Sequence, residues 1–452
     1  MDKKRDSFSG KLGFIFAAAG SAVGLGNLWR FPYLAAKYGG GIFILVYLIL
    51  ATTFGFALMI TEIALGRKTR LSAGSAFGKL DKRFDFIGIL GSIVPLIITP
   101  YYCVIGGWVI KYLISFVTGQ VSQAAGDNYF TGFITESVEP IVWFAVFLLL
   151  TAAVVFIGVQ KGIEKASTIL MPILIILIVC ISIFCATRPG ALAGVKYYLL
   201  PDIKHFSATT VLAAMGQLFY SMSLAMGIMI TYGSYMKKED DLRDSVRKIE
   251  IFDTVVALLA GLMIVPSVFA FSGGSKEALS KGPSLMFVTM PKVFNSMKIG
   301  SLIGAGFFIL VLFAALTSAI SLLETNVSII CDKLHWSRKK STVVATLYCL
   351  IVGGLISLGY GPLSFIKIIG MNLLDFFDFI SNSVLMPIVA MLTCIFIGYI
   401  VKPKTIIDEV ELGGKTFKEK KFYVVMLKYV APVCLLLILL FAVSEALGLI
   451  KV

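Results

Sequence analysis

The sequence is poor in charged residues. Only 15% of its 452 residues are Asp, Glu, Lys or Arg, whereas 58% are hydrophobic and the mean hydropathy is +0.92. Soluble domains have about 25% charged and about 45–50% apolar residues. A water-exposed globule cannot bury so much apolar surface, so this composition excludes a chain of soluble domains. We predict an all-α polytopic membrane protein in the plasma or inner membrane of a cell, with the lipid bilayer as its surroundings.

Residues that hold transition metals or act as nucleophilic catalysts are also scarce. The chain has seven cysteines and only two histidines, which lie far apart at His205 and His335. Most of the cysteines lie within apolar runs, where buried free thiols are expected rather than disulfides or metal ligands; examples are Cys103, Cys180, Cys394 and Cys434. This scarcity disfavours a zinc site and a histidine-based triad, so we do not expect an enzyme.

Eleven apolar segments approach or exceed the roughly 20 residues that a helix needs to cross a bilayer. They are residues 12–36, 41–66, 87–118, 140–160, 166–187, 207–236, 248–271, 299–331, 342–358, 373–401 and 422–448. With the N-terminus inside, 27 of the Lys and Arg residues lie in inner segments and 10 in outer ones. Because cytoplasmic loops are enriched in positive charge, we expect a cytoplasmic N-terminus and an external C-terminus. The net charge of +14 thus reflects topology, and no nucleic-acid partner is expected.

Polar residues and glycines interrupt two of these segments. The first interruption contains Gly20, Gly24, Gly26, Asn27 and Arg30, and the second contains Gln217, Ser221 and Ser223. Close helix packing can explain two glycines four residues apart, and a single serine can bond to its own helix. Interruptions in the first and sixth spans are instead typical of a transporter with inverted repeats and a site near the membrane midplane. We predict one transporter domain over 1–452, with a five-span repeat at 12–187, a second at 207–401, and a last span at 422–448.

Broken helices offer backbone groups to ligands. Free N–H groups attract a carboxylate, and free carbonyls attract sodium or an ammonium group. Three acids, Glu62, Asp253 and Asp378, lie within predicted spans and are functional candidates. Glu62 can instead hold the N–H groups of a broken neighbour, and Asp253 can be an interfacial residue. The adjacent hydroxyls of Thr317 and Ser318 suit a hard cation such as sodium, although they can also bond to their own helix.

Three sequence motifs carry a family resemblance. They are GSAVGLGNLWRFPY at 20–33, ITYGSY at 230–235 and LTSAIS at 316–321. With these motifs the chain resembles the neurotransmitter:sodium symporter family, above all its bacterial amino-acid transporters of the leucine-transporter type. The resemblance covers the first ten spans and implies an 11-helix protein with a 5+5 inverted repeat and broken helices 1 and 6.

The resemblance implies two sodium sites. The first would use the Ala22 carbonyl, Asn27, Ser221, Asp253 and the substrate carboxylate. The second would use the carbonyls of Gly20, Val23 and Ala314 and the hydroxyls of Thr317 and Ser318.

The resemblance also implies an amino-acid site. The carboxylate would meet the N–H groups of Leu25 and Gly26 and the hydroxyl of Tyr102, and the ammonium group would meet Ala22, Tyr220, Ser221 and Ser223. Family carriers of monoamines have Asp at the position of Gly24, so glycine indicates a substrate with an α-carboxylate. The side-chain pocket would comprise Ile98, Tyr102, Tyr220, Met226, Ser318 and Leu322, which favours a hydrophobic or aromatic side chain.

Two gates complete the implied mechanism of alternating access. The outer gate would pair Arg30 with Asp378 beneath a roof formed by Tyr220. The inner gate would pair Arg5 with Asp332, close to Phe8, Ser234 and Tyr235.

The sequence departs from the family pattern at three points. Family members commonly have Asn at position 253, and the animal proteins bind chloride beside the first sodium. The fixed carboxylate of Asp253 can replace that anion, so we expect independence of chloride. The outer aromatic residue, often Phe, is Tyr220, and eleven spans are predicted where many relatives have twelve. Gly162 and Pro172 match a Gly-x9-Pro spacing that the family associates with unwinding of span 5.

These features predict a sodium-coupled symporter of a hydrophobic or aromatic L-amino acid. A channel-like pore is the first alternative, and it would need a continuous polar path. A transceptor, which binds an amino acid in order to signal, is the second, and no soluble output domain was identified for it.

Overall fold

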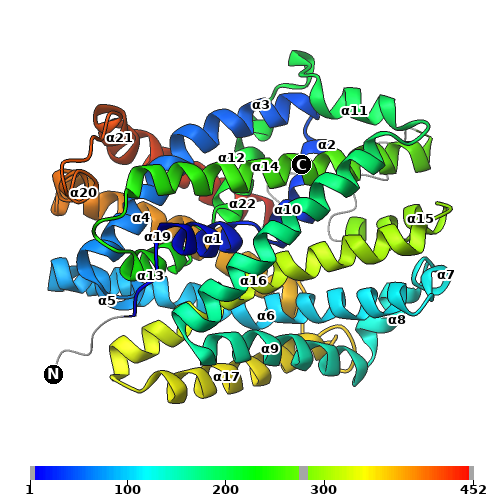
Figure 1. Cartoon of the computed structure of the whole chain (residues 1–452), viewed down its shortest axis with the longest axis horizontal. Coiled ribbons are helices and arrows are strands. Elements are labelled where there is room, and N and C mark those ends of the chain that lie inside the picture. Colours follow the sequence, from blue (N-terminus) through cyan, green and yellow to red (C-terminus); the bar gives the residue numbers. More distant parts are fainter. Residues whose placement is uncertain (1–5, 274–283, 447–452) are drawn as a thin grey trace.

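The computed structural model of the chain describes residues 6–273 and 284–446, which are almost entirely helical, and these residues form no strand. Most of the long helices run along the long axis of the molecule (Figure 1). Among the described residues, nine helical stretches are long and apolar enough to cross a membrane. They are Gly41–Thr69, Lys82–Val117, Glu139–Ile157, Val159–Ala186, Leu242–Ser272, Gly300–Leu334, Arg338–Leu358, Leu373–Ile400 and Lys420–Ala446.

Several of these stretches contain more than one labelled element. Their α-helical elements are α3 (Gly41–Leu50), α4 (Phe56–Thr69), α6 (Asp85–Val117), α9 (Glu139–Ile157), α10 (Lys165–Ala186), α14 (Leu242–Ser272), α16 (Gly300–Leu334), α17 (Arg338–Leu358), α18 (Leu373–Asp378), α19 (Met386–Ile395), α21 (Lys420–Val425) and α22 (Ala431–Ala446). Wide π-helical turns join or extend some of them: η2 (Ala51–Gly55), η4 (Val159–Glu164), η8 (Phe379–Leu385), η9 (Phe396–Ile400) and η10 (Met426–Val430).

The two predicted breaks are present. Helix α1 (Lys11–Ala22) ends where Gly24 and its neighbours begin, and η1 (Gly26–Arg30) with α2 (Phe31–Lys37) continues at a bend of 49°. This bent pair makes a tenth candidate span. Helix α12 (Ala208–Ser221) likewise stops, and α13 (Ile228–Tyr235) begins after a gap of six residues. Each half is shorter than a membrane crossing, so the total of eleven spans stays a prediction.

The backbone of the second break adopts conformations that few residues tolerate. Ser223, Ala225 and Gly227 have φ values of +53°, +57° and +74°. Non-glycine residues in this region are uncommon and persist only where the surrounding structure holds them. The break between α12 and α13 is therefore a defined structure held by its neighbours.

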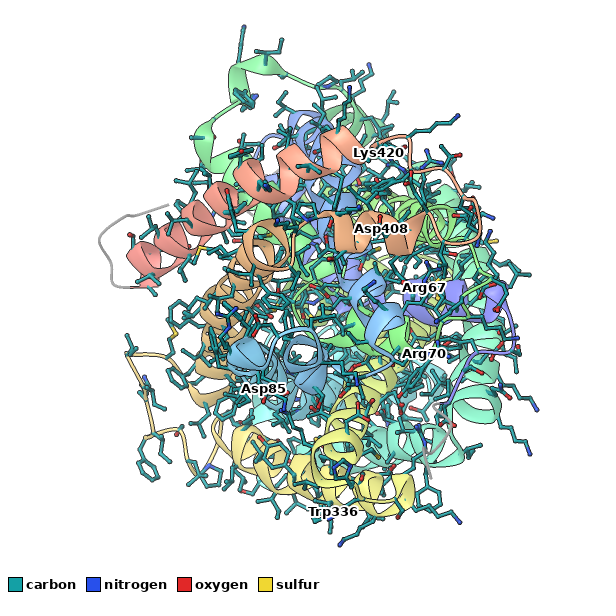
Figure 2. All side chains as sticks on the ribbon, turned by 90° about the vertical axis from the view of Figure 1, so that its left-hand side faces the viewer. Arg67, Arg70, Asp85, Trp336, Asp408 and Lys420 are labelled. Atoms are coloured by element: carbon teal, nitrogen blue, oxygen red, sulfur yellow. The ribbon has the colours of Figure 1, made fainter. Side chains whose placement is uncertain are left out.

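Short elements lie at the two ends of the molecule. One end has α7 (Val121–Ala124), α8 (Tyr129–Thr135), α11 (Ala191–Leu199), η5 (Ile203–His205), η7 (Leu285–Thr289) and α15 (Met290–Asn295). The opposite end has α5 (Ala73–Leu80), η3 (Lys82–Phe84) and α20 (Lys404–Val410). The segments predicted to be cytoplasmic gather at this second end, which Figure 2 shows face on with Arg67, Trp336 and Lys420. Which end faces the cytoplasm stays a prediction.

Burial separates central from peripheral helices. Most of the apolar part of α6 and of α16 is buried, whereas only about a third of the apolar part of α9 and of α10 is buried. The exposed hydrophobic side chains, among them Leu149 and Ile176, suit contact with lipid. All seven cysteines are free, and Cys103 and Cys394 are buried as expected. Cys180 is instead exposed on the outer face of α10, and Cys434 is half-buried.

Candidate functional site

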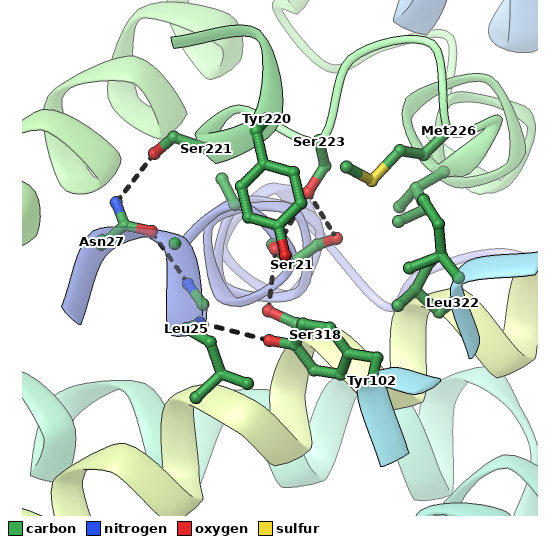
Figure 3. A pocket seen from close by; sticks show the side chains of 15 residues that line it. Ser21, Leu25, Asn27, Tyr102, Tyr220, Ser221, Ser223, Met226, Ser318 and Leu322 are labelled. Atoms are coloured by element: carbon green, nitrogen blue, oxygen red, sulfur yellow. Dashed lines mark hydrogen bonds between the residues drawn. The ribbon is translucent and has the colours of Figure 1, made fainter. Parts of the chain in front are cut away.

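A cavity lies where the two breaks meet. Its walls come from α1, η1, α6, α12, the α12–α13 break, α13 and α16. All twelve residues that the sequence predicted for the substrate line this one cavity, and Ser21, Asn27 and Ile228 line it too. Figure 3 shows the ring of Tyr220 across the cavity, with Met226 and Leu322 on one side. Substrate contacts for these residues stay a prediction.

One wall of the cavity presents hydrogen-bond donors at the first break. The amide N–H of Leu25 donates to the Tyr102 hydroxyl at 3.2 Å, so the two groups face the same point (Figure 3). Gly24 leaves that point clear, since a Cβ there would lie 2.6 Å from Ser318 Oγ and 3.0 Å from the Tyr102 hydroxyl. Any side chain at position 24 would therefore crowd Ser318 and the Tyr102 hydroxyl.

Asp253 of α14 is buried beside this wall rather than interfacial. Its Oδ1 accepts from Asn27 Nδ2 at 2.7 Å and from Ser221 Oγ at 2.8 Å. Its Oδ2 accepts from the hydroxyl of Tyr47 at 3.2 Å. The carboxylate is fully buried among hydrogen-bond donors, the arrangement that makes a buried charge tolerable. Tyr47 was not predicted, because it lies in an otherwise apolar stretch that gives no polar signal.

Three of the oxygen atoms predicted for the second sodium lie close together, those of Gly20, Val23 and Ser318. Ser318 Oγ of α16 lies 3.4 Å from the carbonyl oxygens of both Gly20 and Val23 in the first break. Thr317 Oγ1 lies 3.1 Å from the Ala314 carbonyl oxygen. The carbonyl oxygen nearest to Ser318 Oγ is that of Ser21, at 3.0 Å, and uncharged oxygens of these kinds suit a hard monovalent cation.

Glu62 of α4 holds the second break. Its Oε1 accepts from the backbone N–H of Ala225 at 2.7 Å, and both residues are buried. This contact matches the structural alternative given for Glu62 above. It satisfies a backbone donor that the break would otherwise leave without a partner.

The outer pair lies close together but does not form an ion pair. The Arg30 guanidinium lies over the Tyr220 ring, 5.2 Å from its centre. Asp378 instead accepts from Asn382 Nδ2 at 2.6 Å. Within the described part of the chain, no carboxylate lies within 4.0 Å of the Arg30 guanidinium. The predicted Arg30–Asp378 contact is therefore absent from this conformation, because each member has another partner.

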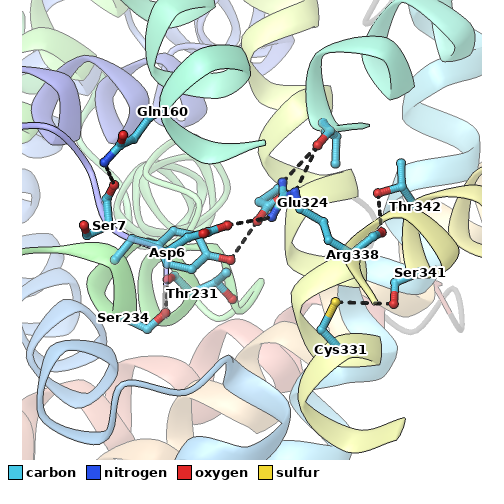
Figure 4. Close-up of polar contacts among 12 residues, drawn as sticks. Asp6, Ser7, Gln160, Thr231, Ser234, Glu324, Cys331, Arg338, Ser341 and Thr342 are labelled. Carbon is cyan, nitrogen blue, oxygen red and sulfur yellow. Dashed lines mark hydrogen bonds and ion pairs between the residues drawn. The ribbon is translucent and has the colours of Figure 1, made fainter. Parts of the chain in front are cut away.

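At the opposite end, the structure shows an ion pair that was not predicted, and the predicted pair of Arg5 with Asp332 lies partly outside the described residues. Arg5 lies outside the described residues, and Asp332 accepts from the backbone N–H of Ser72 at 2.7 Å. The buried Glu324 of α16 pairs with Arg338 of α17, whose Nη1 lies 3.0 Å away, and accepts from the Tyr235 hydroxyl at 2.7 Å (Figure 4). Sequence reasoning missed this pair, although an acid inside the 299–331 segment was a visible signal.

Comparisons with known proteins agree with this architecture. A model of the "Sodium:neurotransmitter symporter family" matches residues 5–139 and 132–449. The sodium-dependent transporter YhdH of Bacillus subtilis (strain 168) is 35% identical over 447 residues, or 97% of this chain and 98% of YhdH. A sodium-dependent transporter of Haemophilus influenzae is 31% identical over 460 residues, or 98% of this chain and 99% of that protein. The structure of MhsT in complex with L-phenylalanine has a TM-score of 0.88 at 37% identity, covering 97% of this chain and 100% of MhsT.

The fold and its twin breaks thus define a multi-pass membrane transporter. The chain belongs to the sodium:neurotransmitter symporter family. The family consists of sodium-dependent transporters rather than enzymes, in agreement with the prediction from composition.

Proposed function

We propose that the protein is a sodium-coupled symporter of L-amino acids with apolar or aromatic side chains. It carries one substrate with two sodium ions by alternating access and needs no chloride. The observation that carries this proposal is the meeting of both helix breaks at one cavity that has polar backbone groups at one end and apolar walls at the other. The proposal includes a cytoplasmic N-terminus and an external C-terminus.

The cavity favours a small zwitterion. The N–H groups of Leu25 and Gly26 and the Tyr102 hydroxyl offer donors to a carboxylate, and the carbonyl groups of the breaks offer acceptors to an ammonium group. Gly24 leaves room for the carboxylate, which supports an α-amino acid over an amine.

The side-chain end of the cavity supports an apolar or aromatic substrate. Ile98, Met226 and Leu322 contribute aliphatic walls, and the ring of Tyr220 covers them (Figure 3). Met226 can adapt to substrates of different shape because its side chain is flexible and polarisable. MhsT, which shares the fold at 37% identity, was solved with L-phenylalanine, and this supports the same substrate class here.

The two predicted sodium sites differ in charge. The second site has only carbonyl and hydroxyl oxygens, so it can release its ion readily. The first has Asp253, whose buried charge lies beside the cavity. A substrate carboxylate that also binds the first sodium would make the binding of ion and amino acid mutually dependent. The fixed charge of Asp253 supports independence of chloride, because it supplies the anion that the first site needs.

Uptake into proteoliposomes tests the proposal. Purified protein is reconstituted and given labelled L-phenylalanine, with inward gradients of sodium or, as the control, potassium. We expect accumulation only with sodium, competition by other apolar amino acids, and none by glutamate or lysine. Exchange of labelled for unlabelled substrate across the membrane excludes a transceptor. Uptake that is independent of sodium, or that does not saturate, would contradict the proposal and support a pore.

A further inference from the structure

The outer end of the cavity contains a buried amide that no assigned role explains. Asn382 lies in η8, one turn beyond Asp378, and only 9% of it is exposed. Its Nδ2 donates to Asp378 Oδ1 at 2.6 Å and to the Tyr101 hydroxyl of α6 at 3.0 Å. The amide therefore ties the carboxylate of span 10 to span 3.

The orientation of this amide leaves its oxygen without a donor. A carboxylate accepts hydrogen bonds, so the nitrogen of Asn382 must face Asp378 and its oxygen must point elsewhere. No described residue donates to Asn382 Oδ1, although the atom is buried. A buried acceptor without a partner is unfavourable, so such an atom in a folded protein needs an explanation.

A suitable donor lies on the wall of the same outer hollow. Arg30, Tyr220 and Asn382 all line the space above the substrate cavity. In this conformation the Arg30 guanidinium lies over Tyr220 and has no ion-pair partner among the described residues. A guanidinium has five N–H donors in a planar fork. It can therefore serve Asp378 and a neighbouring amide oxygen at the same time.

We propose that Asn382 is a positioning residue of the outer gate. Its nitrogen holds Asp378 in place, and its oxygen receives Arg30 when the guanidinium moves from Tyr220 to Asp378. The closed gate then has three members, Arg30, Asp378 and Asn382, and the move satisfies the unpaired oxygen. This inference rests on the proposed function, because it assumes that Arg30 and Asp378 close the outer side of a transport cycle.

Thiol labelling below the gate tests the inference without any substrate. A reporter cysteine is introduced as Ile98→Cys, which lies in the cavity beneath Tyr220, in a background where the exposed Cys180 is replaced by serine. The rate of its reaction with a small methanethiosulfonate reagent in sodium measures how often the outer gate opens. This rate is compared for the parent, Arg30→Ala, Asn382→Leu and the double variant.

Leucine is close to asparagine in size, so Asn382→Leu removes polarity with little change in packing. Loss of one hydrogen bond to a charged group should raise the labelling rate about tenfold, as should Arg30→Ala. The double variant should label no faster than Arg30→Ala alone, because that change already removes every contact of the guanidinium. Ser381→Ala is the matched control, since that hydroxyl lies 3.4 Å from the Tyr101 hydroxyl but donates to the backbone carbonyls of Phe377 and Asp378 rather than to the Asp378 carboxylate. Its labelling rate should not change.

Three outcomes would overturn the inference. The first is an unchanged labelling rate for Asn382→Leu. The second is a labelling rate in the double variant that equals the product of the two single increases. The third is an equal increase for Ser381→Ala, which would show a general loosening of the structure. If Asn382→Leu does not fold, Asn382→Ala must give the same tenfold rise and the same lack of additivity. Because labelling needs no amino acid, a failure of L-phenylalanine uptake in the parent would count against the proposed function alone.

Discussion

Replacing Asp253 by asparagine should make the protein dependent on chloride. In the structure, this carboxylate accepts from an amide, a serine hydroxyl and a tyrosine hydroxyl. These donors form a small anion site that the protein's own side chain fills. Asp253→Asn keeps the size and removes the charge. The donors, among them Tyr47 and Ser221, then have no anion to bind, and a free halide ion can take that role.

The size of the effect follows from Coulomb's law. Two opposite charges about 4 Å apart attract by about 4 kcal/mol at an effective dielectric constant of about 20. Removing the Asp253 charge should therefore weaken sodium binding at the first site by up to about 1,000-fold. Chloride bound close to the asparagine should restore most of that loss.

The assay measures the sodium dependence of L-phenylalanine binding in sodium chloride and in sodium gluconate. The unmodified protein should give the same curve in both salts, whereas Asp253→Asn should bind at low sodium only with chloride. Tyr47→Phe is the matched control, because it removes one 3.2 Å hydrogen bond and leaves the charge. It should weaken sodium binding by less than about tenfold in both salts. Identical curves for Asp253→Asn in the two anions would refute the reasoning.

Three further substitutions test other parts of the structure. Gly24→Ala places a methyl group 2.6 Å from Ser318 Oγ and should weaken substrate binding about 10- to 100-fold. Gly354→Ala is the control in the same binding assay, because its methyl group meets no atom within 4 Å, and it should leave substrate binding unchanged. Thr317→Val keeps the shape and removes an oxygen from the second sodium site, so the sodium concentration for half-maximal binding should rise about tenfold; Thr325→Val, whose hydroxyl bonds to its own helix, should leave it unchanged. The fully buried Arg67 pairs with a carboxylate of α20, so Arg67→Met should destabilise the protein by about 3–5 kcal/mol, measured by unfolding in detergent.

The membrane spans and their breaks were readable from the sequence. Helix limits in the structure differ from the predicted ones by a few residues. The thickness of the bilayer sets the length of the apolar run, and a helix can continue beyond that run. The first break was visible because Gly24, Gly26 and Asn27 are costly inside a lipid-facing helix. The second was visible mainly because its position corresponds to the first. The π-helical turns were not, because no sequence pattern marks them.

The polar partners across the molecule were harder to predict. Tyr47 contacts Asp253 across 206 positions of sequence, and its apolar surroundings give no hint of that bond. Arg338 lies in the predicted inner loop between spans 299–331 and 342–358, where positive charge was taken to report topology, yet it pairs with the buried Glu324. A pattern along one helix shows which side it buries. It does not show which residue of another helix meets it there.

The coupling of sodium to substrate depends on how many ions share the cavity. The ions carry the charge, since an amino-acid zwitterion has none. Each ion that enters with the membrane potential contributes about 2.3 kcal/mol per 100 mV. One ion therefore supports about 50-fold accumulation at that voltage, and two support about 2,000-fold, before any sodium concentration gradient is added. Because we propose two sodium sites, one around Ser318 and one around Asp253, we expect the larger value. Accumulation that stops near 50-fold at a clamped 100 mV would mean that only one of these sites carries a transported ion.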